Sequence, residues 1–379
     1  MQITDVRAVP VYHAERGRNF NFVVVETDAG ITGVGESGIT GKELAIAGCL
    51  EHFRDVLVGQ DPRRIEHLWQ RLFRGGFFKA GQIVSATVSA IDIALWDILG
   101  KSLGVPIYQL LGGKCRERVV AYAHVNGDTP EAVADDARRA VGEGYKFVRI
   151  STTDASNGIF EPRHIVRQTQ SWAEAVRSAI GPDIELCVDF HTRLDPHDSV
   201  RLADRLSGLD LFFIEDPARS ENPDAYAHVR RHTNIPIAGG EELASKWEFK
   251  PLIERDLIDY VRVDLCIAGG ISEARKIAGW AETHYQYLAP HNPLGPVSAA
   301  ACVHLCLASP LVGVQEMPRL PGELSEVFPA QVGFEDGYLS VSDAPGLGIE
   351  IDLEAAARHP FRMRRNPEYR RADGAVTNW

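Results

Sequence analysis

The sequence predicts an α/β fold in which a barrel of parallel strands follows a small α+β unit. The chain has 379 residues, which is more than one compact domain usually holds. From about residue 118, short β-rich runs alternate with amphipathic helical stretches, a pattern typical of a parallel sheet. There are eight such runs, and eight is the number of strands that closes a TIM barrel.

The first part of the chain has the pattern of an α+β unit. Residues 4–13 have the composition of a strand, and residues 21–36 have that of a hairpin turning at 28–30. The motif GVGESG (33–38) matches Gly-x-Gly-x-x-Gly, but a helix follows it where a second parallel strand is needed. We therefore interpret it as a turn and not as a dinucleotide site. Helical periodicity follows at about 41–58, 62–72 and 83–103.

The eight β-rich runs of the predicted barrel occupy most of the remaining chain. In order they are RVVAYAHV (118–125), YKFVRIS (145–151), IELCVDF (184–190), LFFIED (211–216), IPIAGG (235–240), IDYVRVD (258–264), QYLAP (286–290) and LVGVQEM (311–317). After them, FEDGYLSVSD and PGLGIEID predict a short β segment that returns to pack on the N-terminal unit, followed by a polar tail.

Polar side chains stand at the ends of the last six runs, 23 to 27 residues apart, which is one strand and one helix per step. Taken singly, each is equally explained as a solvated strand end or a helix cap. In a barrel, however, the carboxyl ends of all strands open on one face, so the series predicts a shared site. Its members are Asp189 with His191 on the third run, then Glu215, Glu241, Asp264, His291 and Glu316.

Three successive carboxylates in this series, Asp189, Glu215 and Glu241, suit a hard divalent cation. Mg²⁺ takes oxygen ligands and keeps open positions for water or substrate. The sequence therefore predicts Mg²⁺ as the cofactor.

The remaining members of the series suggest proton chemistry beside that ion. A carboxylate bonded to one ring nitrogen of a histidine raises the basicity of the other, so Asp264 and His291 on neighbouring strands predict a base. A base beside a metal suggests proton abstraction next to a metal-bound carboxylate. His191, on a different strand, is then a candidate acid that helps a hydroxide to leave.

Composition excludes several other classes of function. A formal net charge of −12 argues against binding nucleic acid or an anionic membrane surface. We see no signal peptide and expect no apolar run of transmembrane length. The six cysteines are scattered through periodic segments and do not form a disulfide framework. We expect a reduced, cytoplasmic protein.

Nearly the whole chain resembles the enolase superfamily, mandelate-racemase subgroup, and within it the sugar-acid dehydratases, most closely the galactonate dehydratases. The segments that carry the resemblance are SAIDIALWDILGKSLGVPIYQLLGG, VDFHTRL, FIEDP, GGEELASKWEFK, VDLCIAGGISE, APHNPLGPVSAAACVHL, GVQE, PGLGIEID and RNPEYRRADGAVTNW. The resemblance implies an α+β capping domain (1–117), a modified (β/α)₇β barrel (118–316) and a C-terminal segment (317–379) that returns to the capping domain.

The resemblance also implies roles for the strand-end residues. Asp189, Glu215 and Glu241 would bind Mg²⁺, and the dyad of His291 and Asp264 would remove the C2 proton of an acid sugar. His191 would protonate the departing C3 hydroxyl, and Glu316 would hydrogen-bond the developing oxyanion. The product would be a 2-keto-3-deoxy acid. In related proteins the loop at 13–20 closes over the substrate, so the candidates for substrate contact are His13, Arg16 and Arg18, with Asn126 and Arg149 at the ends of the first two strands.

The substrate is the most open part of this prediction. Racemases of the subgroup carry a Lys-x-Lys pair where this chain has YKFVRIS, so racemisation is disfavoured. Segments such as FIEDPARSEN resemble mannonate dehydratases, but those lack the sixth-strand acid, and Asp264 therefore favours D-galactonate. Mannonate or gluconate dehydration with the same metal site, or a barrel of low turnover that serves in binding or regulation, are the alternatives. A homo-oligomer is expected from the resemblance alone.

Overall fold

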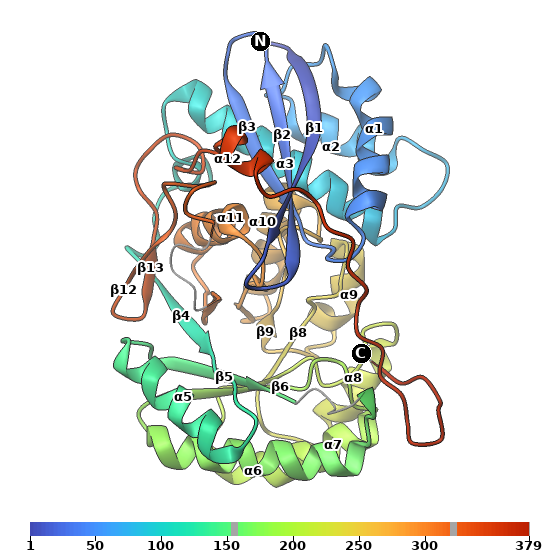
Figure 1. Ribbon diagram of the computed structural model, residues 1–379, viewed down its shortest axis with the longest axis vertical. Coiled ribbons are helices and arrows are strands. Elements are labelled where there is room, and N and C mark those ends of the chain that lie inside the picture. Colours follow the sequence, from blue (N-terminus) through green and yellow to red (C-terminus); the bar gives the residue numbers. More distant parts are fainter. Residues whose placement is uncertain (153–157, 319–323, 379) are drawn as a thin grey trace.

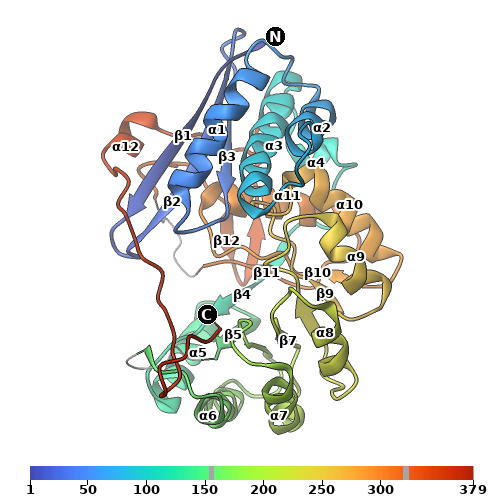
Figure 2. The same cartoon turned by 90° about the vertical axis from the view of Figure 1, so that its right-hand side faces the viewer.

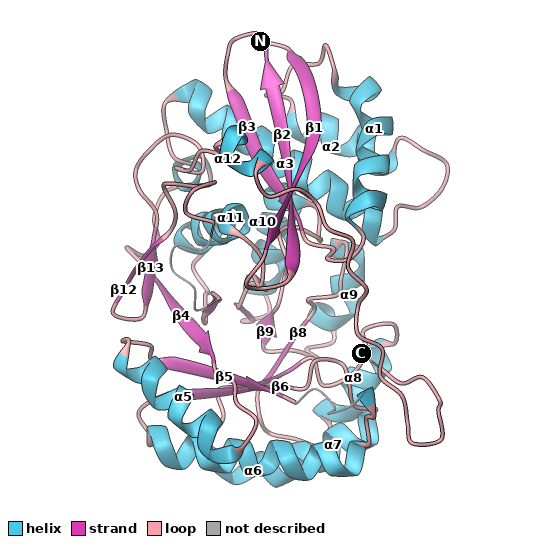
Figure 3. Ribbon diagram, viewed as in Figure 1, coloured by secondary structure: helices cyan, strands magenta, loops and turns pink. Residues whose placement is uncertain are grey.

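The computed structural model describes residues 1–152, 158–318 and 324–378 and consists of a small α+β domain packed on a barrel. In Figure 1 the α+β domain lies above the barrel, and the hairpin between β1 and β2 reaches down towards the centre of the molecule. Figure 3 shows that helices surround the barrel strands on the outside.

The α+β domain is an antiparallel sheet covered by three helices. Its strands follow the order β1-β2-β3, with β1 at Ile3–His13, β2 at Arg18–Thr27 and β3 at Thr32–Ser37. Its helices are α1 (Glu43–Leu57), α2 (Ile65–Arg74) and α3 (Gln82–Leu103). The hairpin and the three helices lie where the sequence predicted them.

Residues 33–37 of the glycine motif lie in strand β3, which corrects our interpretation of the motif as a turn. Gly33 and Gly35 let α3 approach the sheet closely. A Cβ atom on Gly35 would lie 1.8 Å from the carbonyl oxygen of Ala90 in α3. The spacing of these glycines therefore serves helix packing.

Helix α3 also corrects the expectation that no apolar segment has transmembrane length. By length and composition alone it could cross a membrane, but 83% of its most apolar window is buried inside the protein. It packs against β3, α1, α2 and α10. A helix that is apolar all round and covered on all sides is a core helix of a large protein.

The barrel is formed by the eight predicted strands. They are β4 (Val119–His124), β5 (Phe147–Ser151), β6 (Glu185–Asp189), β7 (Phe213–Glu215), β8 (Ile237–Gly239), β9 (Tyr260–Val261), β10 (Tyr287–Leu288) and β11 (Gln315–Glu316). Neighbouring strands from β4 to β10 pair in parallel. The sheet closes because β11 pairs with β4 and Val312 bridges to Leu288.

Helices connect the strands on the outside of the barrel. They are α5 (Pro130–Gly142), α6 (Pro162–Ile180), α7 (Pro196–Leu206), α8 (Pro223–Arg230), α9 (Lys246–Glu254), α10 (Gly270–Glu282) and α11 (Pro296–Ala308), with short pieces at α4 (Ile107–Leu110) and η2 (Ser207–Leu209). The interior is a packed core and not a pore. Its central cluster contains Tyr122, Cys187, Phe213, Ala238, Ala289 and Val314.

The C-terminal segment differs in part from the prediction. Its hairpin, β12 (Gly333–Glu335) and β13 (Tyr338–Ser340), does not pair with the N-terminal sheet. Strand β13 pairs antiparallel with the start of β4, at Val119 and Val120, because β11 occupies this edge of β4 only from Ala121 onward. The segment after the hairpin does reach the α+β domain, where Leu347 N donates to Asp97 and helix α12 (Leu353–Ala357) packs on β1.

Candidate active site

The carboxyl ends of the barrel strands bring the predicted side chains to one face. Asp189 ends β6 and stands in register with Glu215, which ends β7. Glu241 follows β8 by two residues, and the next strands lead to Asp264 and His291. The six-strand series read from the sequence therefore lies at one end of the barrel.

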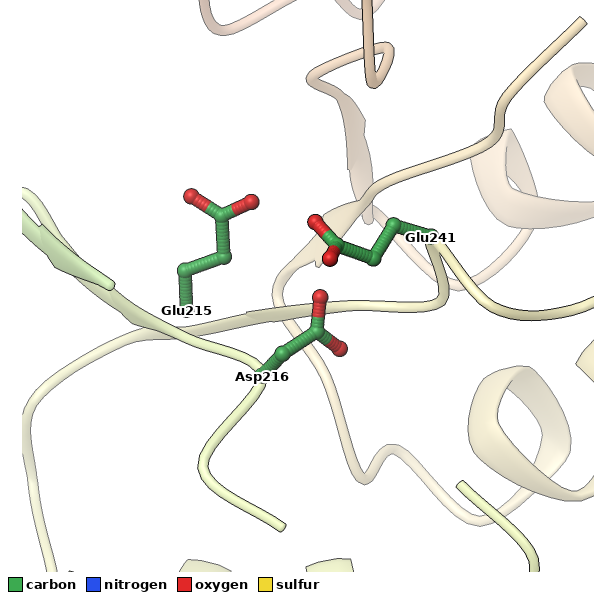
Figure 4. Close-up of side chains that lie close together, drawn as sticks. All are labelled: Glu215, Asp216 and Glu241. Carbon is green, nitrogen blue, oxygen red and sulfur yellow. The ribbon is translucent and has the colours of Figure 1, made fainter. Parts of the chain in front are cut away.

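Three carboxylates meet at the ends of β7 and β8. Glu215, Asp216 and Glu241 each place an oxygen within 4.8 Å of the other two, and Figure 4 shows their carboxylates turned towards one another. We call this set the acidic cluster. Glu215 Oε2, Asp216 Oδ2 and Glu241 Oε2 are buried and have no hydrogen-bond donor within the described part of the chain.

The acidic cluster is electrostatically unfavourable as it stands. Burial and the charges of Asp216, Glu215 and Asp189 raise the pKa of Glu241 well above its ordinary value. Burial and the adjacent Glu215 raise the pKa of Asp216 to about 7. Buried, mutually repelling carboxylates with unused oxygens are the surroundings that a divalent cation stabilises. The donor set is all oxygen, which suits Mg²⁺.

The acidic cluster differs from the predicted metal site in one member, because Asp216 replaces Asp189. Asp189 Oδ1 accepts a 2.6 Å hydrogen bond from the backbone N–H of His191. Its other oxygen accepts from the guanidinium of Arg149, whose Nε lies 3.6 Å from Glu215 Oε2. Arg149 is thus a buried cation between two predicted metal ligands, in contact with protein carboxylates and not with the open cavity.

Asp264 and His291 form the predicted dyad. His291 Nδ1 lies 2.8 Å from Asp264 Oδ2, and Nε2 lies 3.5 Å from Glu241 Oε2. Burial alone would lower the pKa of His291, but the charge of Glu316 and the hydrogen bond to Asp264 outweigh it, so this pKa is raised. The nitrogen facing the acidic cluster is therefore a stronger base than an ordinary imidazole.

A second charged cluster surrounds Arg262, which is fully buried. Its Nε donates to Glu215 Oε1 and its Nη2 donates to Glu316 Oε2, both at 2.6 Å. Nη2 also lies 3.0 Å from the hydroxyl of Tyr122, and Nη1 donates to two backbone carbonyls. We call Arg262 with Glu316 and Tyr122 the arginine cluster. Every guanidinium nitrogen has an acceptor, so the buried charge is fully paired.

The carboxylate of Glu316, which the sequence predicts to hydrogen-bond an oxyanion, is engaged by groups of the protein itself. Its carboxylate accepts from Arg262 and from the backbone N–H of Asn292, and its Oε1 lies 2.8 Å from His124 Nε2. Burial would raise the pKa of Glu316, but the charges of Arg262 and His291 and the contact with His124 outweigh it and hold this pKa well below its ordinary value. An ionised carboxylate has no proton to give to an oxyanion.

His191 lies in a turn directly after β6. Burial, together with the charges of Arg193 and Arg149, lowers the pKa of His191 to about 3, so the ring is neutral at neutral pH. A neutral imidazole carries one N–H, which can donate a hydrogen bond.

A cavity of about 610 Å³ opens between the α+β domain and the barrel. Three of the five predicted substrate contacts line it, namely Arg16, Arg18 and Asn126. Arg18 also donates to the carbonyl of Pro293, two residues beyond His291. His13 is not among the lining residues. Its Nδ1 accepts from the backbone N–H of Arg16 and so holds the hairpin turn.

Besides Asp216 of the acidic cluster, three residues of the site were not predicted from the sequence. His124 lines the cavity and contacts Glu316, and Arg262 and Tyr122 form the buried pairs described above. Arg262 lies two residues before Asp264 on one strand, and Tyr122 lies two before His124 on another. Residues two apart on a strand point to the same face. A polar or aromatic residue two positions before a strand-end group could therefore have been predicted to belong to the site.

Two family models cover most of the chain. Residues 6–112 match the N-terminal domain of mandelate racemase / muconate lactonizing enzyme, and residues 132–356 match the enolase C-terminal domain-like family.

Curated relatives and solved structures match the chain over nearly its full length. A D-mannonate dehydratase of Caulobacter sp. (strain K31) is 38% identical over 96% of each chain. A D-galactonate dehydratase family member of Streptomyces bingchenggensis (strain BCW-1) is 37% identical over 98% of this chain and 97% of its own. The crystal structure of an enolase from Pantoea ananatis with bound D-gluconate and Mg superposes with a TM-score of 0.93, at 33% identity and over 99% of each chain. With its capping domain, its barrel and both family matches, this chain belongs to the mandelate racemase / muconate lactonizing enzyme family of the enolase superfamily.

Proposed function

We propose that this protein is a hydro-lyase that dehydrates a six-carbon aldonic acid, D-galactonate first among the candidates, to its 2-keto-3-deoxy acid. The observation that carries the proposal is the position of the dyad of His291 and Asp264 beside the acidic cluster, with Nε2 of His291 3.5 Å from Glu241. Relatives named as mannonate and galactonate dehydratases over the full chain support the same class of reaction.

The residues present fit a Mg²⁺ ion. Glu215 and Glu241 would hold it with oxygens that are buried and lack donors among the described residues. The third ligand would be Asp189, which requires Arg149 to release one of its oxygens, or Asp216, whose Oδ2 already faces the cluster. When bound, the ion would supply positive charge that stabilises the negative charge developing on the substrate carboxylate.

His291 would remove the proton from C2. Asp264 fixes the ring orientation through Nδ1 and leaves Nε2 as the acceptor. The chain has no second base of the Lys-x-Lys kind on β5, where Arg149 instead contacts Asp189. Racemisation needs a second base that returns a proton to the opposite side of C2. Without one, removal of the C2 proton by His291 favours elimination.

His191 would donate the proton that the departing C3 hydroxyl takes up. Burial and the flanking arginines make the ring neutral before substrate binds. An anionic substrate beside the ring favours the protonated form, so substrate binding would raise the pKa of His191 and let the ring take up from solvent the proton that it then donates.

Glu316 would act differently from the sequence expectation. Because it is ionised and shared by Arg262 and His124, it would raise the basicity of His291 and hold the wall of the cavity. Arg16 and Arg18, which line the cavity from the capping domain, would contact the acid sugar.

The experiment is an incubation of the purified protein with Mg²⁺ and a panel of acid sugars, followed by an assay for 2-keto-3-deoxy products. Turnover of D-galactonate supports the first choice. Turnover of mannonate or gluconate only would replace the substrate but keep the reaction. Binding of an acid sugar with no turnover of any member would favour a binding or regulatory protein. We also expect a cytoplasmic location and a homo-oligomer.

The third ligand can be determined separately by calorimetric Mg²⁺ titration of Asp189→Asn and Asp216→Asn. If Asp189 is a ligand, its replacement should weaken binding more than that of Asp216, whose Oδ1 is bonded to Tyr226 and to the backbone of Gly240. A larger loss of binding in Asp216→Asn would make Asp216, and not Asp189, the third ligand.

A further inference from the structure

The turn that carries His191 has an unusual backbone. His191 and Thr192 follow β6 with φ angles of +52° and +55°. Two consecutive residues other than glycine in the left-handed region are rare, and the second is β-branched. Such a conformation persists only where its surroundings hold it.

Hydrogen bonds from the ends of the barrel strands hold part of this turn. The backbone N–H of His191 donates to Asp189 Oδ1, and that of Thr192 donates to the carbonyl of Asp216 at 2.9 Å. One acceptor belongs to Asp189, a predicted metal ligand, and the other to Asp216 of the acidic cluster. Their positions are therefore linked directly to the position of the histidine ring.

Thr152, at the end of β5, connects the same turn to the neighbouring strand. Its N–H donates to the carbonyl of Asp189 at 2.7 Å, and its hydroxyl donates to the carbonyl of Phe190 at 3.0 Å. In return, Arg193 Nη1 donates to the carbonyl of Thr152 at 2.6 Å. Arg193 is buried, so this charged hydrogen bond is shielded from water.

The C-terminal tail lies directly on Arg193. The guanidinium carbon is 5.4 Å from the centre of the Tyr369 ring, a cation–π contact, and Tyr369 is itself buried. Asn378 Nδ2 lies 3.5 Å from the carbonyl of Arg193 and 3.4 Å from Asp195 Oδ1. Arg371 lies 3.9 Å from the other oxygen of Asp195. Three tail residues thus contact the two residues that end the turn.

The tail is anchored beside this contact. The N–H of Arg370 donates to the carbonyl of Gly158 at 2.9 Å, and the carbonyl of Arg370 accepts from the N–H of Phe160 at 2.8 Å. In Figure 2 the tail descends from α12 along the outside of the molecule to the neighbourhood of α5 and β5. A segment that starts on the capping domain therefore ends on the turn of His191.

We propose that the C-terminal tail positions His191, with Arg193 as the connecting residue between Tyr369 of the tail and Thr152 of the barrel. Arg193 and Tyr369 are positioning residues, since they act through the turn and not on the substrate. The effect of the tail on catalysis rests on the proposed function, in which His191 is the acid. If His191 has that role, loosening the tail should impair dehydration but spare proton removal by His291, which lies on another strand.

The structural part is tested on the whole, metal-free protein by hydrogen–deuterium exchange. In Tyr369→Ala, the amides of residues 190–195 should exchange roughly tenfold faster than in the wild type. Tyr369→Phe, which keeps the ring, and Arg364→Ala, which changes an exposed tail arginine, should match the wild type. Unchanged exchange in Tyr369→Ala would overturn the proposal.

The catalytic part is tested by comparing two rates in the Mg²⁺-loaded protein. In Tyr369→Ala, dehydration should fall roughly 10- to 100-fold, because a small displacement of a catalytic group costs that much. Exchange of the C2 proton with solvent should stay close to the wild-type rate. An equal loss of both rates together with a lower melting temperature would indicate a purely structural tail and overturn the proposal.

These two tests separate failure of this inference from failure of the proposed function. If no acid sugar reacts but residues 190–195 lose protection, the positioning contact stands and the function is wrong. If dehydration proceeds and neither measurement responds to Tyr369→Ala, the positioning contact is wrong and the function stands. Should Tyr369→Ala not fold, Arg371→Ala combined with Asn378→Ala removes the polar contacts of the tail, and the same outcomes apply to it.

Discussion

The acidic cluster and the arginine cluster lie at the same end of the barrel and share Glu215, yet they differ in how their charges are satisfied. In the arginine cluster, Arg262 finds an acceptor for every nitrogen. In the acidic cluster, three buried oxygens have no donor among the described residues. Buried charge is costly unless paired, so the first cluster is complete without a ligand, whereas the carboxylates of the second need protons or a cation to relieve their repulsion. The buried oxygens that lack a hydrogen bond, and not the number of charges, distinguish the acidic cluster from the arginine cluster.

His291 connects the two clusters, and its replacement should have the largest effect. It lies 3.5 Å from Glu241 on one side, and the charge of Glu316 helps to raise its pKa on the other. His291→Asn keeps the size of the side chain but removes the base, so exchange of the C2 proton should fall by about 10³-fold or more. The measurement is proton exchange of D-galactonate in D₂O by NMR. Exchange retained in this variant would mean that another group is the base.

Breaking the arginine cluster should cost stability and not only activity. Arg262→Met leaves Glu215 and Glu316 buried without their main partner, and we expect a loss of about 3–5 kcal/mol in the free energy of unfolding. Urea unfolding measures it. Arg255→Met is the matched control, because Arg255 pairs with Asp224 at the surface, where such pairs contribute about 0–1 kcal/mol. Equal effects of the two variants would show that the pairing of Arg262 is not what stabilises the cluster.

Breaking the acidic cluster should have the opposite effect on the metal-free protein. Glu241→Gln removes a repelling charge, so stability in EDTA should rise or stay level, while Mg²⁺ affinity should fall by roughly 100-fold because a ligand is lost. Calorimetric titration measures the affinity, and Glu242→Gln on the next residue serves as control. Undiminished Mg²⁺ binding by Glu241→Gln would remove Glu241 from the site.

The smallest predicted effect is a pH dependence of stabilisation by Mg²⁺. The pKa of Asp216 is raised from 3.8 to about 7. The protonated carboxyl therefore contributes stability at low pH, and this contribution is lost as the pH rises through about 7. Because Mg²⁺ needs the ionised forms, the rise in melting temperature on adding Mg²⁺ should grow by a few degrees between about pH 5 and pH 8. A rise that is independent of pH would contradict coupling between the ion and these protons.

Much of the fold could be predicted because it follows from local pattern. Each barrel strand is a short apolar run, and the regular spacing of Asp189, Glu215, Glu241, Asp264 and His291 reflects one strand and one helix per step. The pairing of β13 with β4 could not be predicted, because it depends on which part of an edge another strand leaves open. The burial of α3 likewise could not be predicted, because it depends on the elements packed around the helix.

The directions of side chains in the site could not be predicted in the same way. Position in the chain places Asp189 and Glu215 side by side, but the partner of each oxygen depends on Arg149 and Arg262, which come from other strands. The ionised state of Glu316 also follows from contacts with residues far away in the sequence, Arg262 and His124. Spacing identifies which groups meet, and packing determines what each group can do.

The most direct test is a crystal structure of the protein with Mn²⁺, whose anomalous scattering locates the ion. We predict one anomalous peak within bonding distance of Glu215 and Glu241, with its third carboxylate from Asp189 or Asp216. A protein that binds no ion there, or that binds it only away from both glutamates, would contradict the assignment of the acidic cluster as the metal site.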